Sequence, residues 1–135
     1  MTKHPYLRAY MAGIVVPTFI LLIIMTVFTS VRYFSHIPVP IERVIVFPMA
    51  VVPNLWGLWN VLYLSLGLRG RMSLGIFGAI LPFILAPAGL LLASAMGLWQ
   101  FVSIYFVFAF PMALIIYYIV WGEVVKFFNE VLEIA

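Results

Sequence analysis

The charged residues of this chain leave three long stretches free of charge, and these stretches constrain the fold more than any other feature. Residues 9–31, 44–68 and 72–122 contain no Asp, Glu, Lys or Arg, in a chain of 135 residues. The hydrocarbon core of a bilayer is about 30 Å thick, which an α-helix crosses in about 20 residues. The first two stretches therefore predict one transmembrane helix each, and the third is long enough to predict two.

The composition agrees with a membrane protein. Hydrophobic residues make up 67% of the chain and charged residues 8%, and the mean hydropathy of +1.24 is outside the range of soluble domains. We expect an all-α, polytopic integral membrane protein, a four-helix transmembrane bundle with proline-kinked spans at about 10–31, 44–67, 73–96 and 100–121. An amphipathic helix is expected at 123–135, and the whole chain is expected to form a single membrane domain.

Basic residues near the ends of the spans predict the orientation. One side of the membrane receives Lys3, Arg8, Arg69, Arg71 and Lys126, and the other receives Arg32 and Arg43. Because basic residues are enriched in cytoplasmic loops, both termini are expected in the cytoplasm, with the chain in a bacterial inner membrane. The net charge of +3 then reflects topology, and no basic cluster indicates a nucleic-acid partner.

Small residues recur on the second and third spans at steps of three and four, which places them on one face of each helix. The two stripes are Ala50, Pro53, Gly57, Asn60, Leu64 and Gly67, and Gly75, Ala79, Pro82, Ala86, Gly89 and Ala93. If the chain folds back at 67–71, the stripes face each other, with Gly57 opposite Ala86 and Asn60 opposite Pro82. Close approach over small residues favours helix association in lipid, so we expect this helix seam to hold the two spans together.

Five residues of the second span form a candidate pocket or a packing cluster: Asn54, Trp56, Trp59, Asn60 and Tyr63. As a pocket they suit a flat apolar, aromatic or cationic ligand. No acid lies nearby to hold a cation, which favours bulky packing instead. For Asn60 we expect a structural role, with its amide bonded to the carbonyl of Gly78, which Pro82 deprives of its helical donor.

The sequence offers no chemistry typical of an enzyme. It has no cysteine, so thiol catalysis and thiolate metal sites are excluded. His4 and His36 are expected on opposite sides of the membrane, where they cannot share a metal or a haem. Paired carboxylates and a Gly-rich phosphate loop are lacking. We therefore expect a chain that is not an enzyme, with no catalytic residues, no cofactor and no metal.

The tail divides into two faces. Charges lie on one face, at Glu123, Lys126, Glu130 and Glu133, and apolar side chains on the other, at Val124, Phe127, Phe128, Val131 and Ile134. Such a helix can lie in the headgroup region, dock on a partner, or continue the fourth span and rest on the first or second. Just before it, Tyr117, Tyr118 and Trp121 are expected to form an aromatic belt at the inner interface.

Charge-free spans, a docking tail and little soluble mass favour an accessory or structural subunit of a membrane assembly. Its expected partners are the lipid bilayer and other membrane subunits, or further copies of itself. The alternative is a small homo-oligomeric transporter or channel for a neutral or hydrophobic solute, built around the second and third spans. A third interpretation is an enzyme that uses Glu42 and His36 at the outer surface.

Overall fold

The computed structural model describes residues 3–36, 50–95 and 99–134, and all secondary structure in these ranges is helical. The elements are α1 (Pro5–Ser35), α3 (Val52–Ser65), α4 (Leu74–Ile80), α5 (Pro82–Ala95), α6 (Trp99–Ile119), the π-helix η2 (Val120–Val125) and α7 (Lys126–Val131). Three helical stretches in the described residues are long and apolar enough to cross a membrane: Pro5–Ser35, Leu74–Leu92 and Phe106–Val131. The second expected span begins outside the described residues, and α3 is its described part.

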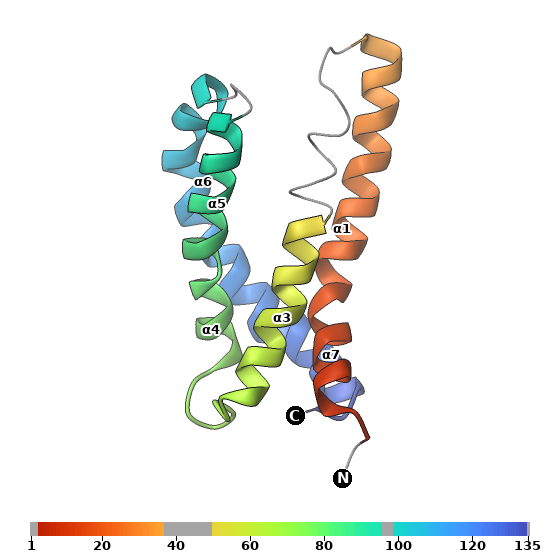
Figure 1. The fold of residues 1–135 in the computed structure, drawn as a ribbon, viewed down its shortest axis with the longest axis vertical. Coiled ribbons are helices and arrows are strands. Elements are labelled where there is room, and N and C mark those ends of the chain that lie inside the picture. The colour runs from red at the N-terminus through yellow and green to blue at the C-terminus, as the bar shows by residue number, and fades with distance from the viewer. Residues whose placement is uncertain (1–2, 37–49, 96–98, 135) are drawn as a thin grey trace.

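The helices form two groups that meet at one end of the molecule (Figure 1). One group is α1 with α3, and the other is α4 and α5 with α6 beside them. From α6 the chain continues through η2 into α7, which reaches across to α1. The start of α1, the α3–α4 turn and α7 lie at one end, which we call the terminal end. The last turn of α1 and the first turn of α6 lie at the opposite, distal end.

The turn between α3 and α4 is closed by backbone hydrogen bonds that glycine makes possible. The amides of Gly67 and Leu68 donate to the carbonyls of Leu64 and Tyr63, which is the double bond pattern of a Schellman motif. Gly67 has a φ of 60° and Gly70 a φ of 81°, in the left-handed region that favours glycine. The side chain of Tyr63 in α3 also holds the turn in place, because its Oη donates to the carbonyl of Met72 (2.8 Å).

Prolines act differently in different helices. At Pro82 the missing N–H separates α4 from α5, and the carbonyl of Gly78 instead accepts from the amide of Leu81 (3.1 Å). The helices α1, α5 and α6 continue through Pro17, Pro87 and Pro111, and the kinks expected there remain predictions.

Glycines bring helices into close contact, but not between the helices that we expected. A Cβ on Gly57 would meet the ring of Tyr10 in α1, and one on Gly13 of α1 would lie 2.6 Å from the carbonyl oxygen of Trp56. On α4, a Cβ at Gly75 would lie 2.8 Å from the carbonyl oxygen of Tyr118. The seam prediction was therefore wrong about the partners: α3 packs mainly on α1, and α4 on α6 and η2.

The remaining members of the expected seam follow the same arrangement. Ala79, Ala86 and Gly89 are partly buried and Pro82 is buried. They belong to α4 and α5, whose main neighbour is α6, with η2 also packed on α4. The backbones of α3 and α4 come close at few points, and the two helices meet through side chains, as where Trp59 stacks on Phe77.

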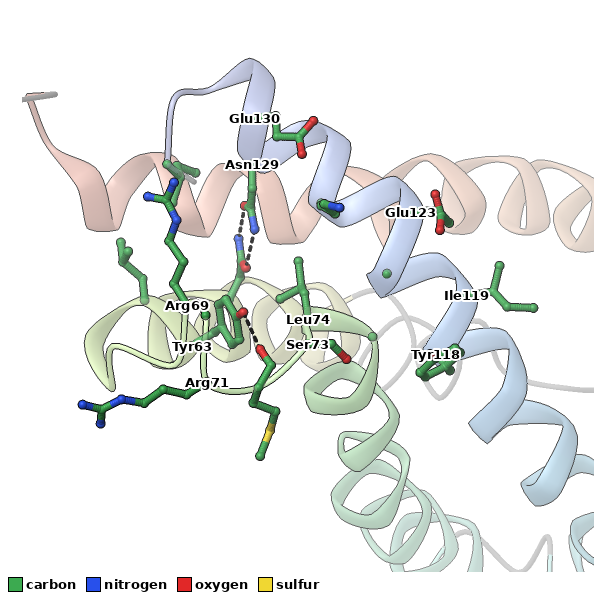
Figure 2. A pocket seen from close by; sticks show the side chains of 18 residues that line it. Tyr63, Arg69, Arg71, Ser73, Leu74, Tyr118, Ile119, Glu123, Asn129 and Glu130 are labelled. Atoms are coloured by element: carbon green, nitrogen blue, oxygen red, sulfur yellow. Dashed lines mark hydrogen bonds between the residues drawn. The ribbon is translucent and has the colours of Figure 1, made fainter.

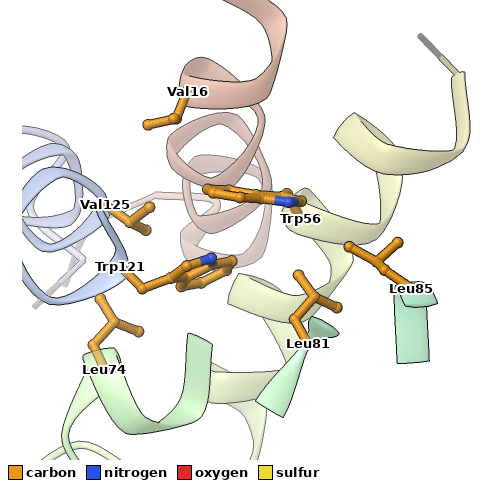
Figure 3. Packing of buried hydrophobic residues seen from close by; sticks show 7 residues of the cluster. All are labelled: Val16, Trp56, Leu74, Leu81, Leu85, Trp121 and Val125. Atoms are coloured by element: carbon orange, nitrogen blue, oxygen red, sulfur yellow. The ribbon is translucent and has the colours of Figure 1, made fainter. Parts of the chain in front are cut away.

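Two tryptophans form the centre of the core, where the two groups of helices meet (Figure 3). Trp56 of α3 and Trp121 of η2 have ring centroids 5.1 Å apart and are 5% and 0% exposed. The buried cluster also contains Val16, Leu74, Leu81, Leu85 and Val125. Trp121 is thus a core residue, and the prediction that it belongs to an interfacial belt was wrong. Its indole N–H has no partner among the described residues, so it contributes by packing.

Candidate functional site

A pair of buried asparagines joins three helices at the terminal end. Asn60 Nδ2 donates to Asn129 Oδ1 (2.7 Å), and Asn129 Nδ2 donates back to Asn60 Oδ1 (3.1 Å), as the dashed lines in Figure 2 mark. Asn60 Nδ2 also donates to the carbonyl of Ala9 in α1 (2.7 Å). The two side chains are 1% and 4% exposed. A reciprocal amide pair satisfies polar groups that would be costly to bury alone, so it fixes α7 against α3 and α1.

This geometry corrects the role predicted for Asn60. The side chain is structural, but it bonds to Asn129 and Ala9 and not to the carbonyl of Gly78. That carbonyl already accepts from Leu81 within its own turn. Because the backbone of α3 packs closely on α1 and much less on α4, the amide of Asn60 faces a different neighbour from the one expected.

A second contact fastens the end of α7 to the start of α1. Arg8 Nη1 donates to the carbonyl of Leu132 (3.2 Å) and lies 3.5 Å from Glu133 Oε2. Basic side chains near a helix C-terminus bond to its last carbonyls and favour its dipole. Arg8 therefore acts as a C-terminal cap supplied by another helix.

The faces of the tail differ from the expected ones. Val125 and Asn129 are buried, whereas Phe127 and Val131, both on the predicted apolar face, are each 57% exposed. The tail continues the chain from α6 and rests on α1 and α3, which was one of the interpretations left open. Part of its apolar surface consequently faces away from the protein.

A half-open cavity of about 700 Å³ lies between the α3–α4 turn, the start of α4, η2 and α7. Figure 2 shows Arg69 and Arg71 on the turn and Glu123 and Glu130 on η2 and α7, on the other side. Asn129 is part of its wall. The volume is within the range of about 300–1,000 Å³ found for small-molecule sites. We call this space the terminal cavity.

Of the five residues predicted as a pocket or packing cluster, Asn60 and Tyr63 line the terminal cavity, and the others have local roles. Trp56 is in the core and donates to Tyr117 Oη (3.2 Å). Trp59 donates to the carbonyl of Phe77 (2.8 Å) and stacks on its ring. Asn54 is exposed, accepts from the hydroxyl of Tyr10 and donates to the carbonyl of Ala50 (2.6 Å).

Groups that could hold a metal ion were not found among the described residues. His4 precedes α1 and His36 follows it. A helix of this length separates its ends by about 45 Å, which is too far for the two histidines to bind one metal ion. Glu42 lies outside the described residues, so the structure says nothing of the enzyme interpretation that used it with His36.

Three residues that matter to the site were missed: Asn129, Arg8 and Gly13. The signal for Asn129 is its spacing, because Trp121, Val125 and Asn129 follow at steps of four and share one helical face. The structure shows that all three are buried. A polar residue in a charged tail is usually solvated, so this spacing alone does not single out Asn129. For Arg8 and Gly13 the sequence gives no comparable signal, since each depends on which helix lies next to α1.

Comparisons of the chain with protein-family models, with curated proteins and with solved structures found no significant match. The function is therefore inferred from the geometry and the composition.

Proposed function

We propose that this chain is a non-enzymatic integral membrane subunit, which crosses a bacterial inner membrane four times with both termini in the cytoplasm. In this proposal the terminal end faces the cytoplasm, and the distal end faces the other side. The chain associates inside the bilayer with helices of other proteins or of further copies.

The observation that carries this proposal is how little of the long apolar helices the chain itself buries. In the most apolar 18-residue window of α1, 17% of the residues are buried, and in that of Phe106–Val131 only 6%. Beyond Pro17, the one buried residue of α1 among the described part of the chain is Met25. Large side chains such as Phe19, Ile23 and Phe108 are between 65% and 77% exposed. A chain that worked alone would be expected to bury a stripe along each helix.

The basic residues support the orientation. Arg8, Arg69, Arg71 and Lys126 all lie near the terminal end, where the helices end or turn. Apolar stretches on either side of these charges match the positive-inside pattern of a protein with cytoplasmic termini.

Native mass spectrometry tests the proposal, on the chain extracted from its own membrane in a mild detergent. We expect a stable complex with a second protein or a defined number of copies. A monomer over the whole range of protein concentrations would contradict the subunit proposal.

A small homo-oligomeric transporter is the second candidate, and the terminal cavity is the observation that favours it. The residues of the expected pathway, however, are packed: Trp56 is 5% exposed and Asn60 is bonded on two sides. A solute path would therefore run between copies. Solute flux into liposomes that falls on Asn54→Ala, a change at an exposed position that should keep the melting temperature, would support this candidate over a subunit that is inert alone.

A further inference from the structure

One side of α3 is left uncovered by the described part of the chain. Four residues recur along it at steps of four, three and four, which places them on the same side of the helix: Asn54, Leu58, Val61 and Ser65. Val61 is half-buried and the other three are exposed. Trp56 and Asn60, by contrast, are buried on the opposite side of the helix. We call these four residues the exposed α3 face.

Asn54, the polar member at the start of this face, is only half satisfied. Its Oδ1 accepts from the hydroxyl of Tyr10, and its Nδ2 donates to the carbonyl of Ala50 (2.6 Å). A side-chain amide has two N–H donors, and its oxygen accepts two hydrogen bonds. Among the residues that the structure describes, the second N–H and the second acceptor position of Asn54 have no partner. One donor and one acceptor therefore remain on the same exposed group.

The depth of Asn54 follows from the crossing of α1 and α3. The two helices run in opposite directions (Figure 1), and Gly57 lies against Gly13. Gly13 is five residues from Arg8, and Asn54 is three residues beyond Gly57, so Asn54 lies about 12 Å from the level of Arg8. In the proposed membrane placement, on which this inference rests, Arg8 is at headgroup level. Asn54 is then inside a hydrocarbon core about 30 Å thick, where no water can complete its amide.

We propose that the exposed α3 face joins two copies of this chain, with the Asn54 amides of the two copies bonded to each other. Copies with the same orientation in a membrane are related by a two-fold axis along the membrane normal, so their α3 helices run parallel and equivalent residues meet. Each Nδ2 donates to the Oδ1 of the other copy, which uses the remaining donor and acceptor of both. The chain already contains this reciprocal geometry, between Asn60 and Asn129.

A second copy fits this face better than the alternatives. A lipid acyl chain has neither donor nor acceptor, and it leaves the amide unpaired. A different protein would have to place a donor and an acceptor at this depth, whereas a second copy provides both by symmetry. The face carries no charge, so two copies do not repel each other. A single polar position in an apolar contact also fixes the register, because a shifted copy would place the amide of Asn54 against Leu58.

The inference deepens the proposed function by naming one partner and its surface. The exposed α3 face holds two copies together, and the distal half of α1 is not part of it. The apolar surface of α1 consequently stays available to helices of other proteins.

Disulfide trapping in native membranes tests the pairing, because the sequence contains no cysteine. Leu58→Cys places a thiol beside the two-fold axis, and a disulfide forms when the two Cα atoms are about 4.4–6.8 Å apart. We expect a covalent dimer after mild oxidation. Ile84→Cys on α5 is the matched control, since Ile84 is 44% exposed and Leu58 56%, and it should stay monomeric. No dimer from position 58, or equal dimer from both positions, would overturn the proposal.

Two further substitutions, made in the Leu58→Cys chain, test the amide pair. Asn54→Leu should lower the yield of dimer about threefold, the effect of an average hydrogen bond between membrane helices. Tyr10→Phe removes the bond to Asn54 within the chain but leaves the amide, so the yield should stay the same. An unchanged yield in Asn54→Leu would contradict the amide pair. An equal fall in Tyr10→Phe would also contradict it, because the loss would then come from a disturbed contact between α1 and α3.

Two outcomes separate this inference from the proposed function. Alkaline carbonate washing of the source membranes should leave the chain in the pellet, and release into the supernatant would contradict the membrane placement itself. A pelleted chain that forms a stable complex with a second protein, but no dimer through position 58, would contradict this inference and leave the subunit proposal intact.

Discussion

The two ends of this molecule are built differently. At the terminal end, glycines bring helices into contact, two tryptophans share a core, and Asn60, Asn129 and Arg8 join three helices by hydrogen bonds. Toward the distal end, α1 and the described side chains of α6 are mostly exposed and apolar. The contrast teaches that the chain's own packing is concentrated at one end, while the other end leaves apolar surface that the chain itself does not cover.

The largest effect is expected where backbones touch. In Gly13→Ala the new Cβ would lie 2.6 Å from the carbonyl oxygen of Trp56 and 2.8 Å from the Cα of Gly57, which are backbone atoms that cannot turn aside. We expect a loss of about 3 kcal/mol in the free energy of unfolding, because α1 and α3 must move apart. Unfolding in mixed detergent micelles measures it.

Gly122→Ala is the control for this substitution. Its Cβ would come no closer than 3.6 Å to Gly75, an ordinary contact, so we expect a change within about 1 kcal/mol. Equal stability of the two variants would show that the close crossing of α1 and α3 does not hold the terminal end together.

The next effect concerns the asparagine pair. Asn60→Leu or Asn129→Leu leaves a buried amide without its partner, and each is expected to cost about 1–3 kcal/mol of unfolding free energy. The double variant should cost less than the sum of the two, because it removes both polar groups. Melting curves of the four proteins give the coupling. Strictly additive losses would mean that the two amides do not depend on each other.

A smaller effect is expected at the contact between α1 and α7. Arg8→Gln removes the ion pair with Glu133, whose side chain is 74% exposed, and weakens the cap on the carbonyl of Leu132. Exposed pairs contribute at most about 1 kcal/mol, so global stability should hardly change. Amide hydrogen exchange in α7 should nevertheless become faster, and more so than in Lys3→Gln. Unchanged exchange in α7 would exclude a role of Arg8 as its cap.

The smallest effect on the isolated chain is expected at the distal end. Ile23→Ser changes a side chain that is 66% exposed, so the melting temperature of the detergent-solubilised chain should stay nearly constant. Assembly in the membrane should weaken instead, because this surface is proposed to contact other helices. A large drop in the melting temperature would show that the distal half of α1 packs within the chain after all.

The helical fold and the apolar stretches were predictable, because runs without charge have few alternatives to helices in a membrane. The α3–α4 turn was also predictable, because Gly67 and Gly70 lie next to two arginines in a short basic segment between two apolar runs. Helix pairing was not. A stripe of small residues predicts that a helix face is closely packed. It does not say against which helix, so the spacing of Gly57 is equally compatible with packing on α5, as expected, or on α1, as found.

The candidate site was harder to predict for a local reason. Trp121, Val125 and Asn129 lie at steps of four along η2 and α7, and all three are buried. The inward face of the tail is therefore the one that continues from Trp121, and not the apolar stripe around Phe127. Val125 and Asn129 consequently face inward, and Phe127 outward. Asn129 could be recognised as a site residue only once its partner Asn60 was known to lie across from it.

The most direct test of the central claim compares two positions on the same helix. A photo-crosslinking amino acid would replace Met11, which is 47% exposed in the terminal half of α1, or Ile23, which is 66% exposed in the distal half. Irradiation of intact cells should give specific protein adducts from position 23 and few from position 11. Protein adducts from position 11 alone, or none from either position, would contradict the claim that the distal half is the surface for assembly.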